Sequence, residues 1–271
     1  MRVLWPALVL AVVLTPQAPA YDTKVLVTGH ELPKELSNVG VEEHLGAALD
    51  LSLSFTDETG ATIPLGTFFN KGKPVLMAMV YYTCPSLCNY HLNGLTNAMR
   101  ELKWTTGQDF ELVAVSMNSK ETPDLAIKKK ANYLQAYDRH QGDSGWHFLV
   151  GSTENVQRLA DQFGFKFHWL EEKQQFAHAS VAYVVTPDGK ISRYLHGIQI
   201  DPGTLKLSLL EASGGKIGSV LEQAVMFCFQ FDPVKNKYTL YAWNIMRIGG
   251  LLMVLLLAAL FIPIWWRERR T

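Results

Sequence analysis

The chain has 271 residues, more than one modest domain needs, and its 25 Lys and Arg balance its 25 Asp and Glu to give a net charge of zero. No long basic or acidic run occurs in the sequence. Because phosphate binding needs a clustered positive face, this charge distribution argues against a nucleic acid as a partner.

The first 20 residues have the pattern of a secretory signal peptide. A Met-Arg start is followed by an apolar run over residues 3–14 and by an Ala-x-Ala end at Ala20. We therefore expect an exported protein that loses residues 1–20, with a buried N-terminal strand or helix as the alternative. Residues 21–45 are polar and mixed, and we expect an extended lead-in there.

The clearest strand signal is the uninterrupted apolar and aromatic run over residues 75–82. It is too short to span a bilayer and is typical of a strand buried on both faces. Residues 49–55 alternate apolar and polar as a half-exposed strand does, and residues 63–69 follow a turn as a second hairpin strand. After the central run, an apolar stripe at steps of four and three predicts an amphipathic helix: Cys88, Leu92, Leu95, Met99 and Leu102.

The rest of the body alternates strands and helices. A lysine triplet over residues 128–130, on the second helix, is expected to form a solvated face. Strands separated by helices predict an α/β fold with a mixed sheet, and the strand, cysteine turn, helix and terminal hairpin narrow this to a thioredoxin-like fold over residues 46–215. Strands are predicted at 110–116, 146–150, 181–185 and 191–195, and helices from Thr122 and Pro123 towards Arg139, from Ser152 or Thr153 to Gly164, and over 202–212.

The C-terminal end has a long apolar stretch. Every residue from 248 to 266 is apolar, Gly or Pro, which is long enough to cross the hydrocarbon core of a bilayer. We expect a C-terminal transmembrane helix over residues 245–266, preceded by a juxtamembrane segment (216–244), with a buried core helix as the alternative. The arginines of the last residues, 267–271, predict a cytoplasmic tail by the positive-inside rule.

Two of the three cysteines stand four residues apart, directly after the central strand. Cys84 is a candidate N-cap, Pro85 suits the first turn of a helix, and Cys88 lies on its inward side. The helix dipole and the unpaired N–H groups there favour a thiolate, so we expect lowered thiol pKa values. At this spacing both sulfurs can face one side, where they could form a redox-active pair or converge on a metal ion. A structural disulfide is the alternative, although so short a loop removes little chain entropy.

A metal site would need a third ligand, and eight histidines are available. His178 differs from the others because it lies in a small-residue loop just before the predicted hairpin, where thioredoxins carry a cis-proline facing the cysteine turn. Two soft sulfurs favour Cu(I) or Zn, and an added imidazole also suits Cu(II). Cys228 is expected to be a buried, inert thiol, with an extra ligand or an intermolecular disulfide as alternatives. The other histidines remain open as ordinary polar or core residues: His30, His44, His91, His140, His147, His168 and His196.

Several short motifs together resemble the Sco/SenC family over residues 45–215. They are Tyr-Tyr-Thr-Cys84-Pro-Ser-Leu-Cys88, Gly145-Trp-His-Phe-Leu-Val-Gly151, Phe176-Ala-His178-Ala-Ser-Val, Thr186-Pro-Asp-Gly189 and Ser192-Arg-Tyr-Leu-His-Gly197. The resemblance implies a thioredoxin-like fold and one copper ion held by Cys84, Cys88 and His178. It also implies a role in assembling the binuclear copper centre of cytochrome c oxidase. Two departures from the family concern Asn89, where a proline is common, and Ser116-Met-Asn-Ser119, where Ser-x-Asp-Pro is common.

The resemblance therefore implies a copper metallochaperone, handling Cu(I) or Cu(II), whose partner is the copper-centre subunit of cytochrome c oxidase. Other periplasmic copper carriers or thiol reductants are further partners. With the expected export and anchor, the soluble domain would lie in the bacterial periplasm, tethered to the inner membrane. One alternative is a thiol–disulfide oxidoreductase that uses Cys84 and Cys88 to reduce the acceptor's cysteines. Another is a non-catalytic scaffold in which the two cysteines only staple a loop.

Overall fold

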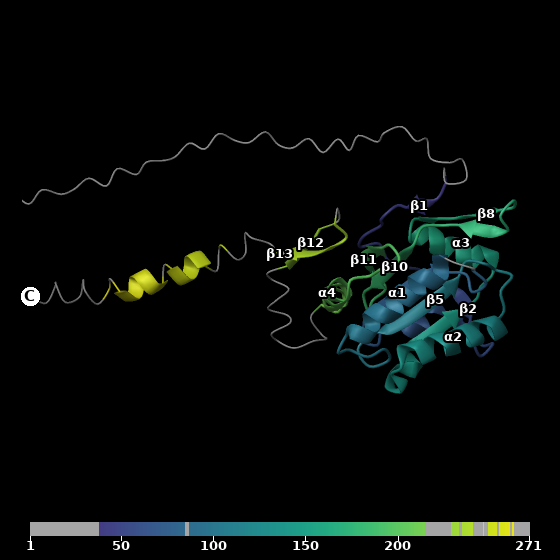
Figure 1. Cartoon of the computed structure of the whole chain (residues 1–271), viewed down its shortest axis with the longest axis horizontal. Helices are drawn as coiled ribbons and strands as arrows, with labels where there is room; N and C mark the ends of the chain where they lie inside the picture. The colour runs from purple at the N-terminus through teal and green to yellow at the C-terminus, as the bar shows by residue number, and fades with distance from the viewer. Residues whose placement is uncertain are drawn as a thin grey trace, which may run out of the picture.

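The centre of the fold is a five-stranded mixed sheet with the strand order β11–β10–β4–β5–β6 (Figure 1). The computed structural model describes residues 38–84, 87–214, 229–232, 235–240, 246, 249–253, 255–260 and 262. β4, β5 and β6 run parallel, and β10 and β11 run antiparallel to their neighbours. The strands are β4 (Val75–Val80), β5 (Glu111–Ser116), β6 (Trp146–Leu149), β10 (Val181–Val185) and β11 (Ile191–His196).

β4 is the predicted central strand, and all of its residues are buried. β5 and β10 are buried along their whole length as well. Near-continuous apolar strands of this kind result when helices cover both faces of a sheet. The prediction from the apolar run is therefore confirmed, with β4 at the middle position of the sheet.

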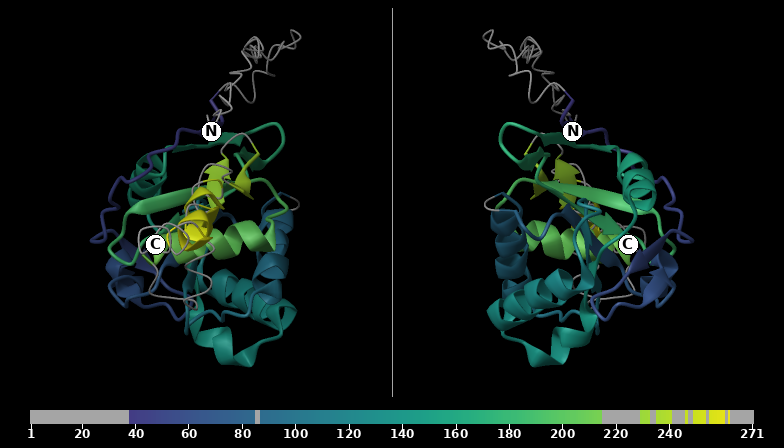
Figure 2. Two further views of the ribbon diagram at one scale, coloured as in Figure 1. Left: turned by 90° about the vertical axis from the view of Figure 1, so that its left-hand side faces the viewer. Right: turned by 90° about the vertical axis from the view of Figure 1, so that its right-hand side faces the viewer.

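Helices cover both faces of the sheet (Figure 2). α1 packs against both α2 and α4 on one face, and α3 lies on the other. Two successive right-handed crossovers, from β4 to β5 and from β5 to β6, place α1 and α2 on the same face. The predicted apolar stripe of α1 is buried throughout. The helices are α1 (Leu87–Glu101), α2 (Pro123–Tyr137), α3 (Thr153–Gln162) and α4 (Pro202–Ala212).

The helix boundaries follow local signals. α2 begins with Pro123 at its first turn, and α3 is capped by the Ser152 side chain, which accepts a hydrogen bond from the backbone N–H of Asn155. α2 ends at Tyr137 because Asp138 takes a left-handed conformation with φ of 55°. The helix is thus slightly shorter than predicted.

Short two-stranded sheets surround the central one. The predicted strand over residues 49–55 forms only at its end, where β2 begins at Ser54. The chain turns before it, because the Asp50 carboxylate accepts hydrogen bonds from the backbone N–H and the hydroxyl of Ser52. The hairpin of β8 and β9 was not predicted, and β13 packs against α4. The remaining elements are β1 (Gly40–Val41) with β7 (Phe165–Lys166), β2 (Ser54–Thr56) with β3 (Thr62–Pro64), β8 (His168–Leu170) with β9 (Gln175–Ala177), β12 (Phe229–Asp232) with β13 (Lys237–Leu240), and the 3₁₀ helices η2 (Leu65–Phe68) and η3 (His140–Gly145).

The prediction that the fold includes a C-terminal transmembrane helix over residues 245–266 is wrong. Among the residues that the structure describes, no helix is long and apolar enough to cross a membrane. The fold class supported is therefore the mixed α/β, thioredoxin-type arrangement alone. The expected signal peptide, Cys228 and the expected cytoplasmic tail lie outside the described residues.

Candidate metal centre

The two cysteines lie where the central strand meets the first helix. Cys84 follows β4, Cys88 is in the first turn of α1, and their exposed fractions are 5% and 1%. The backbone N–H of Cys88 points at Cys84 Sγ over 3.3 Å, so a donor of the first helical turn meets this sulfur. Both side chains are in the thiol form rather than joined as a disulfide. Pro85 and Ser86, between them, lie outside the described residues.

His178 reaches the cysteines from the chain before β10, the strand that pairs with β4. It lies in the loop between β9 and β10 and is 9% exposed. Its Nε2 atom is 3.2 Å from Cys88 Sγ, and its Nδ1 atom is 2.8 Å from the carbonyl oxygen of Ala179. A carbonyl can only accept, so Nδ1 carries the proton and Nε2 presents a lone pair towards the sulfurs.

These three side chains form a group that could hold a metal ion. One ligand atom each from Cys84, Cys88 and His178 lies within 4.8 Å of the other two. Two sulfurs and one imidazole nitrogen are the donor set that suits Cu(I), and the imidazole also accommodates Cu(II). The hydrogen bond from Nδ1 fixes the ring orientation, as partners of metal-binding histidines commonly do. The donor chemistry therefore fits copper.

Burial changes the acidity of the site. Burial raises the pKa of the Cys88 thiol, and a backbone hydrogen bond with Tyr81 opposes this only in part. The expectation of a lowered pKa is therefore wrong for Cys88 in the metal-free protein, because desolvation outweighs the helix terminus. A thiol must lose its proton to become a ligand, so copper binding and proton release are coupled here.

Aromatic rings enclose the histidine. The Tyr81 ring lies 6.1 Å from the His178 ring, and the Phe165 ring lies 6.2 Å from it. Burial, followed by a hydrogen bond with Cys84, raises the pKa of Tyr81, so this phenol stays neutral. Phe176 belongs to the same aromatic cluster, since its ring is 5.3 Å from that of Tyr81.

Glu121, a buried residue that no sequence motif indicated, holds the loop between β4 and α1. Its carboxylate accepts hydrogen bonds from the backbone N–H groups of Tyr82 and Thr83, each at 2.7 Å. The Thr83 and Ser116 hydroxyls donate to the same carboxylate, also at 2.7 Å. Glu121 lies between the end of β5 and the Thr-Pro start of α2, so its place near the carboxyl end of β5 follows from the sequence. Its hydrogen-bond partners do not, because no sequence pattern indicates them.

Asn89 and Lys129 add a second support, from α1 and α2. The Asn89 amide donates to the carbonyl oxygen of Cys84 at 2.8 Å, and Lys129 Nζ donates to Asn89 Oδ1 at 2.6 Å. The lysine triplet was expected to be a solvated face, which holds for the exposed Lys128. Lys130 instead forms an ion pair with Glu58.

The other described histidines are held away from this group. His91 is buried on α1, with Nδ1 2.9 Å from both the carbonyl oxygen of Gly197 and the Ser180 hydroxyl. Burial lowers the pKa of His91 to about 4, so the ring is neutral. His30 lies outside the described residues, and the remaining contacts are His44 with Gln162, His140 with Asp143, His147 with Glu111, and His196 with Glu43, while Nδ1 of His168 is buried without a hydrogen-bond partner.

Comparison with known proteins agrees with the fold and the motifs. Residues 42–209, more than half of the chain, match the SCO1/SenC family, so the chain belongs to that family. It is 25% identical over 152 residues to a SCO1 protein homolog of Bacillus subtilis (strain 168), covering 55% of this chain and 74% of that protein. The resemblance stated from the sequence is confirmed.

Two solved structures show the same fold at lower sequence identity. A candidate electron transfer protein from Aquifex aeolicus VF5 aligns with a TM-score of 0.56 and 22% identity, over 63% of this chain and 95% of that one. BsSco, a member of the Sco family of cytochrome c oxidase assembly proteins in which a disulfide switch was identified, aligns with a TM-score of 0.52 and 22% identity. That alignment covers 64% of this chain and 97% of BsSco. The thioredoxin-type part of the fold prediction is thereby confirmed.

Proposed function

We propose that this protein is a copper metallochaperone for cytochrome c oxidase assembly, and that Cys84, Cys88 and His178 hold its copper. The observation that supports this most directly is the approach of the three ligand atoms to within 4.8 Å of one another. Membership of the SCO1/SenC family supports the same function. The acceptor is the copper-centre subunit of the oxidase.

Copper is the cargo of this reaction. The two thiols lose their protons as the ion enters, and His178 completes the ligand set through Nε2. Because the sulfurs lie at the start of α1, beside a loop that leads out of the sheet, one cysteine can be exchanged for a thiolate of the acceptor. Soft thiolates on both proteins allow the ion to pass without release into water.

A second candidate is thiol–disulfide exchange with the acceptor, and the contact of the Cys88 N–H with Cys84 Sγ at 3.3 Å favours it. In this reaction, the two thiols would form one disulfide while a disulfide of the acceptor is broken. Two electrons and two protons would move from Cys84 and Cys88 to the acceptor's sulfurs. Identification of a disulfide switch in BsSco, a structural neighbour, is consistent with such chemistry.

For the location of the protein, we infer that the copper-binding domain, residues 46–215, works in the bacterial periplasm. The support is the signal-peptide pattern of the first 20 residues. Periplasmic copper carriers and thiol reductants are then available as further partners. The periplasmic location can be tested with a labelled alkylating reagent that does not cross the inner membrane. The reagent is added to intact spheroplasts. Labelling of Cys84 and Cys88 supports the periplasmic location, and their labelling only after lysis contradicts it.

The proposed function is tested by copper content and by oxidase assembly. The purified protein should bind one copper ion per chain, and the variants Cys84→Ser and Cys88→Ser should bind far less. The variant His178→Ala separates the two candidates, because reduction of the acceptor needs the cysteines but not the imidazole. Loss of oxidase assembly in His178→Ala supports copper delivery, whereas assembly that survives in it but fails in Cys84→Ser supports thiol exchange.

A further inference from the structure

A chain of two hydrogen bonds connects α2 to the first cysteine. Lys129 Nζ donates to Asn89 Oδ1 at 2.6 Å, and the Asn89 amide nitrogen donates to the Cys84 carbonyl oxygen at 2.8 Å. Asn89 is partly buried and directly follows Cys88 on α1, and α2 packs against α1 along this side. The two bonds therefore tie the backbone at Cys84 to a charged group on a neighbouring helix.

The position of Lys129 also places its charge near the sulfurs. Burial lowers the pKa of Lys129, and the nearby charges of Cys84 and Cys88 act in the opposite direction. Glu121, which holds the loop before Cys84, faces the same group and acts in the same direction as the cysteines. The neighbours in the triplet differ, since Lys128 is exposed and Lys130 is paired with Glu58.

A copper site of two thiolates and one neutral imidazole has a charge imbalance. Cu(I) carries one positive charge and the thiolates carry two negative charges, so the loaded site has a net charge of −1. In a buried site such a charge is costly unless an opposite charge lies close by. The ammonium group of Lys129 is a nearby group of the required sign.

We propose that Lys129 is a positioning residue of the copper site, which fixes the backbone at Cys84 through Asn89 and offsets the negative charge of the loaded dithiolate. The inference rests on the proposed role of Cys84 and Cys88 as copper ligands. It also gives a physical role to Asn89, whose side chain accepts from Lys129 and donates to Cys84.

The test is the Cu(I) dissociation constant of the full chain, measured by competition with the chromophoric chelator bicinchoninate under reducing conditions. Lys129→Met should weaken Cu(I) binding about tenfold, because it removes both the charge and the donor. Lys129→Arg should restore binding to within about threefold, since it keeps the charge and a donor. Lys128→Met is the matched control, a neighbouring exposed lysine of the same helix, and should bind as the unmodified chain does.

A second variant separates the hydrogen bonds from the charge. Asn89→Leu removes both hydrogen bonds but keeps the ammonium group, so it should weaken binding less than Lys129→Met. In the double variant that combines Asn89→Leu with Lys129→Met, the loss of Cu(I) binding free energy should not exceed the sum of the two single losses. A loss smaller than that sum measures the coupling between the two side chains. If Lys129→Met does not fold, Lys129→Leu, which also removes both the charge and the donor, replaces it with the same expected outcome.

Failure of this inference can be told apart from failure of the proposed function. If the unmodified chain binds one Cu(I) but Lys129→Met binds as tightly as Lys128→Met, the role of Lys129 is wrong and the copper site stands. The inference is also overturned if Lys129→Arg binds as weakly as Lys129→Met, since the charge then contributes nothing. If the unmodified chain binds no copper, or binds it equally well in Cys84→Ser, both proposals fail together.

Discussion

His178 Nε2 lies 3.2 Å from Cys88 Sγ, although 90 positions separate the two residues in the chain. The sheet brings them together, because β10 pairs antiparallel with β4 and its Ala182 lies opposite Ala78. The loop that precedes β10 therefore reaches the same end of the sheet as the loop that follows β4. A buried nitrogen lone pair then faces two sulfurs, which is the arrangement that the copper proposal requires.

Removal of the imidazole should weaken copper binding without unfolding the protein. His178→Ala leaves two sulfur ligands, and we expect the Cu(I) dissociation constant to rise by about a hundredfold or more. The absorption bands from thiolate to Cu(II) should be lost or strongly altered. Competition titration and visible spectroscopy measure these effects. His140→Ala, which removes a highly exposed imidazole, is the control and should change neither.

Removal of the Glu121 carboxylate should destabilise the loop before Cys84. In Glu121→Ala, the buried N–H of Tyr82 and the partly buried N–H of Thr83 lose their acceptor. We expect the free energy of unfolding to fall by about 3 kcal/mol, measured by urea denaturation. Glu121→Gln should lose less, because one side-chain oxygen still accepts. A loss no greater than that of the exposed control Glu172→Ala would show that the loop does not depend on this residue.

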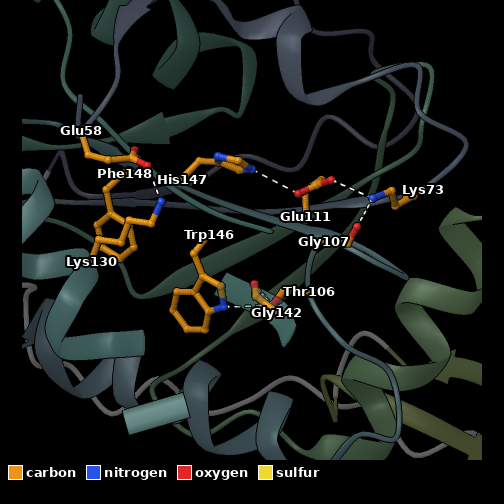
Figure 3. A network of polar contacts seen from close by, with 10 residues as sticks. All are labelled: Glu58, Lys73, Thr106, Gly107, Glu111, Lys130, Gly142, Trp146, His147 and Phe148. Atoms are coloured by element: carbon orange, nitrogen blue, oxygen red, sulfur yellow. Dashed lines mark hydrogen bonds and ion pairs between the residues drawn. The ribbon is translucent and has the colours of Figure 1, made fainter. Parts of the chain in front are cut away.

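Stability should depend on pH through Glu111, which lies in a polar network at the far end of the sheet (Figure 3). Burial alone would raise the pKa of Glu111, but hydrogen bonds from His147 and Lys73 hold it below its ordinary value of 4.5. A lowered folded-state pKa adds stability that is fully present above the unfolded value and is lost as the pH falls through the folded value. Urea midpoints of the unmodified chain should therefore fall as the pH drops below about 4.5. Glu111→Gln should show a weaker pH dependence in that range, and an unchanged one would contradict the assignment.

Copper binding should release protons at neutral pH. Because burial raises the pKa of Cys88, this thiol is protonated in the metal-free protein and must lose its proton to bind copper. Calorimetry in buffers of different ionisation enthalpy should report release of at least one proton for each copper bound. Proton release that is unchanged in Cys88→Ser would show that the protons come from elsewhere.

The cysteine pair could be predicted from the sequence, whereas the third ligand could not be fixed by spacing alone. Local sequence patterns predict the apolar strand, the Cys-Pro turn and the amphipathic helix that follows. Cys84 and Cys88 are buried at the junction that these patterns predict. His178 was singled out by its loop position and by family resemblance, because strand pairing between β4 and β10 is a long-range property.

The residues that support the metal site could be predicted from the sequence even less well than its ligands. Lys129 was expected to be solvated with its neighbours, and only the packing of α2 on α1 shows that it reaches Asn89. The transmembrane prediction rested on the apolar composition of residues 248–266, and no helix among the described residues is long and apolar enough to cross a membrane.

X-ray absorption spectroscopy at the copper edge tests the copper ligands of the copper(I)-loaded protein most directly. We expect two sulfur ligands and one imidazole nitrogen for each copper, with the nitrogen lost in His178→Ala and a sulfur lost in Cys84→Ser or Cys88→Ser. A copper environment without sulfur, or one that is unchanged in all three variants, would contradict the proposed copper site.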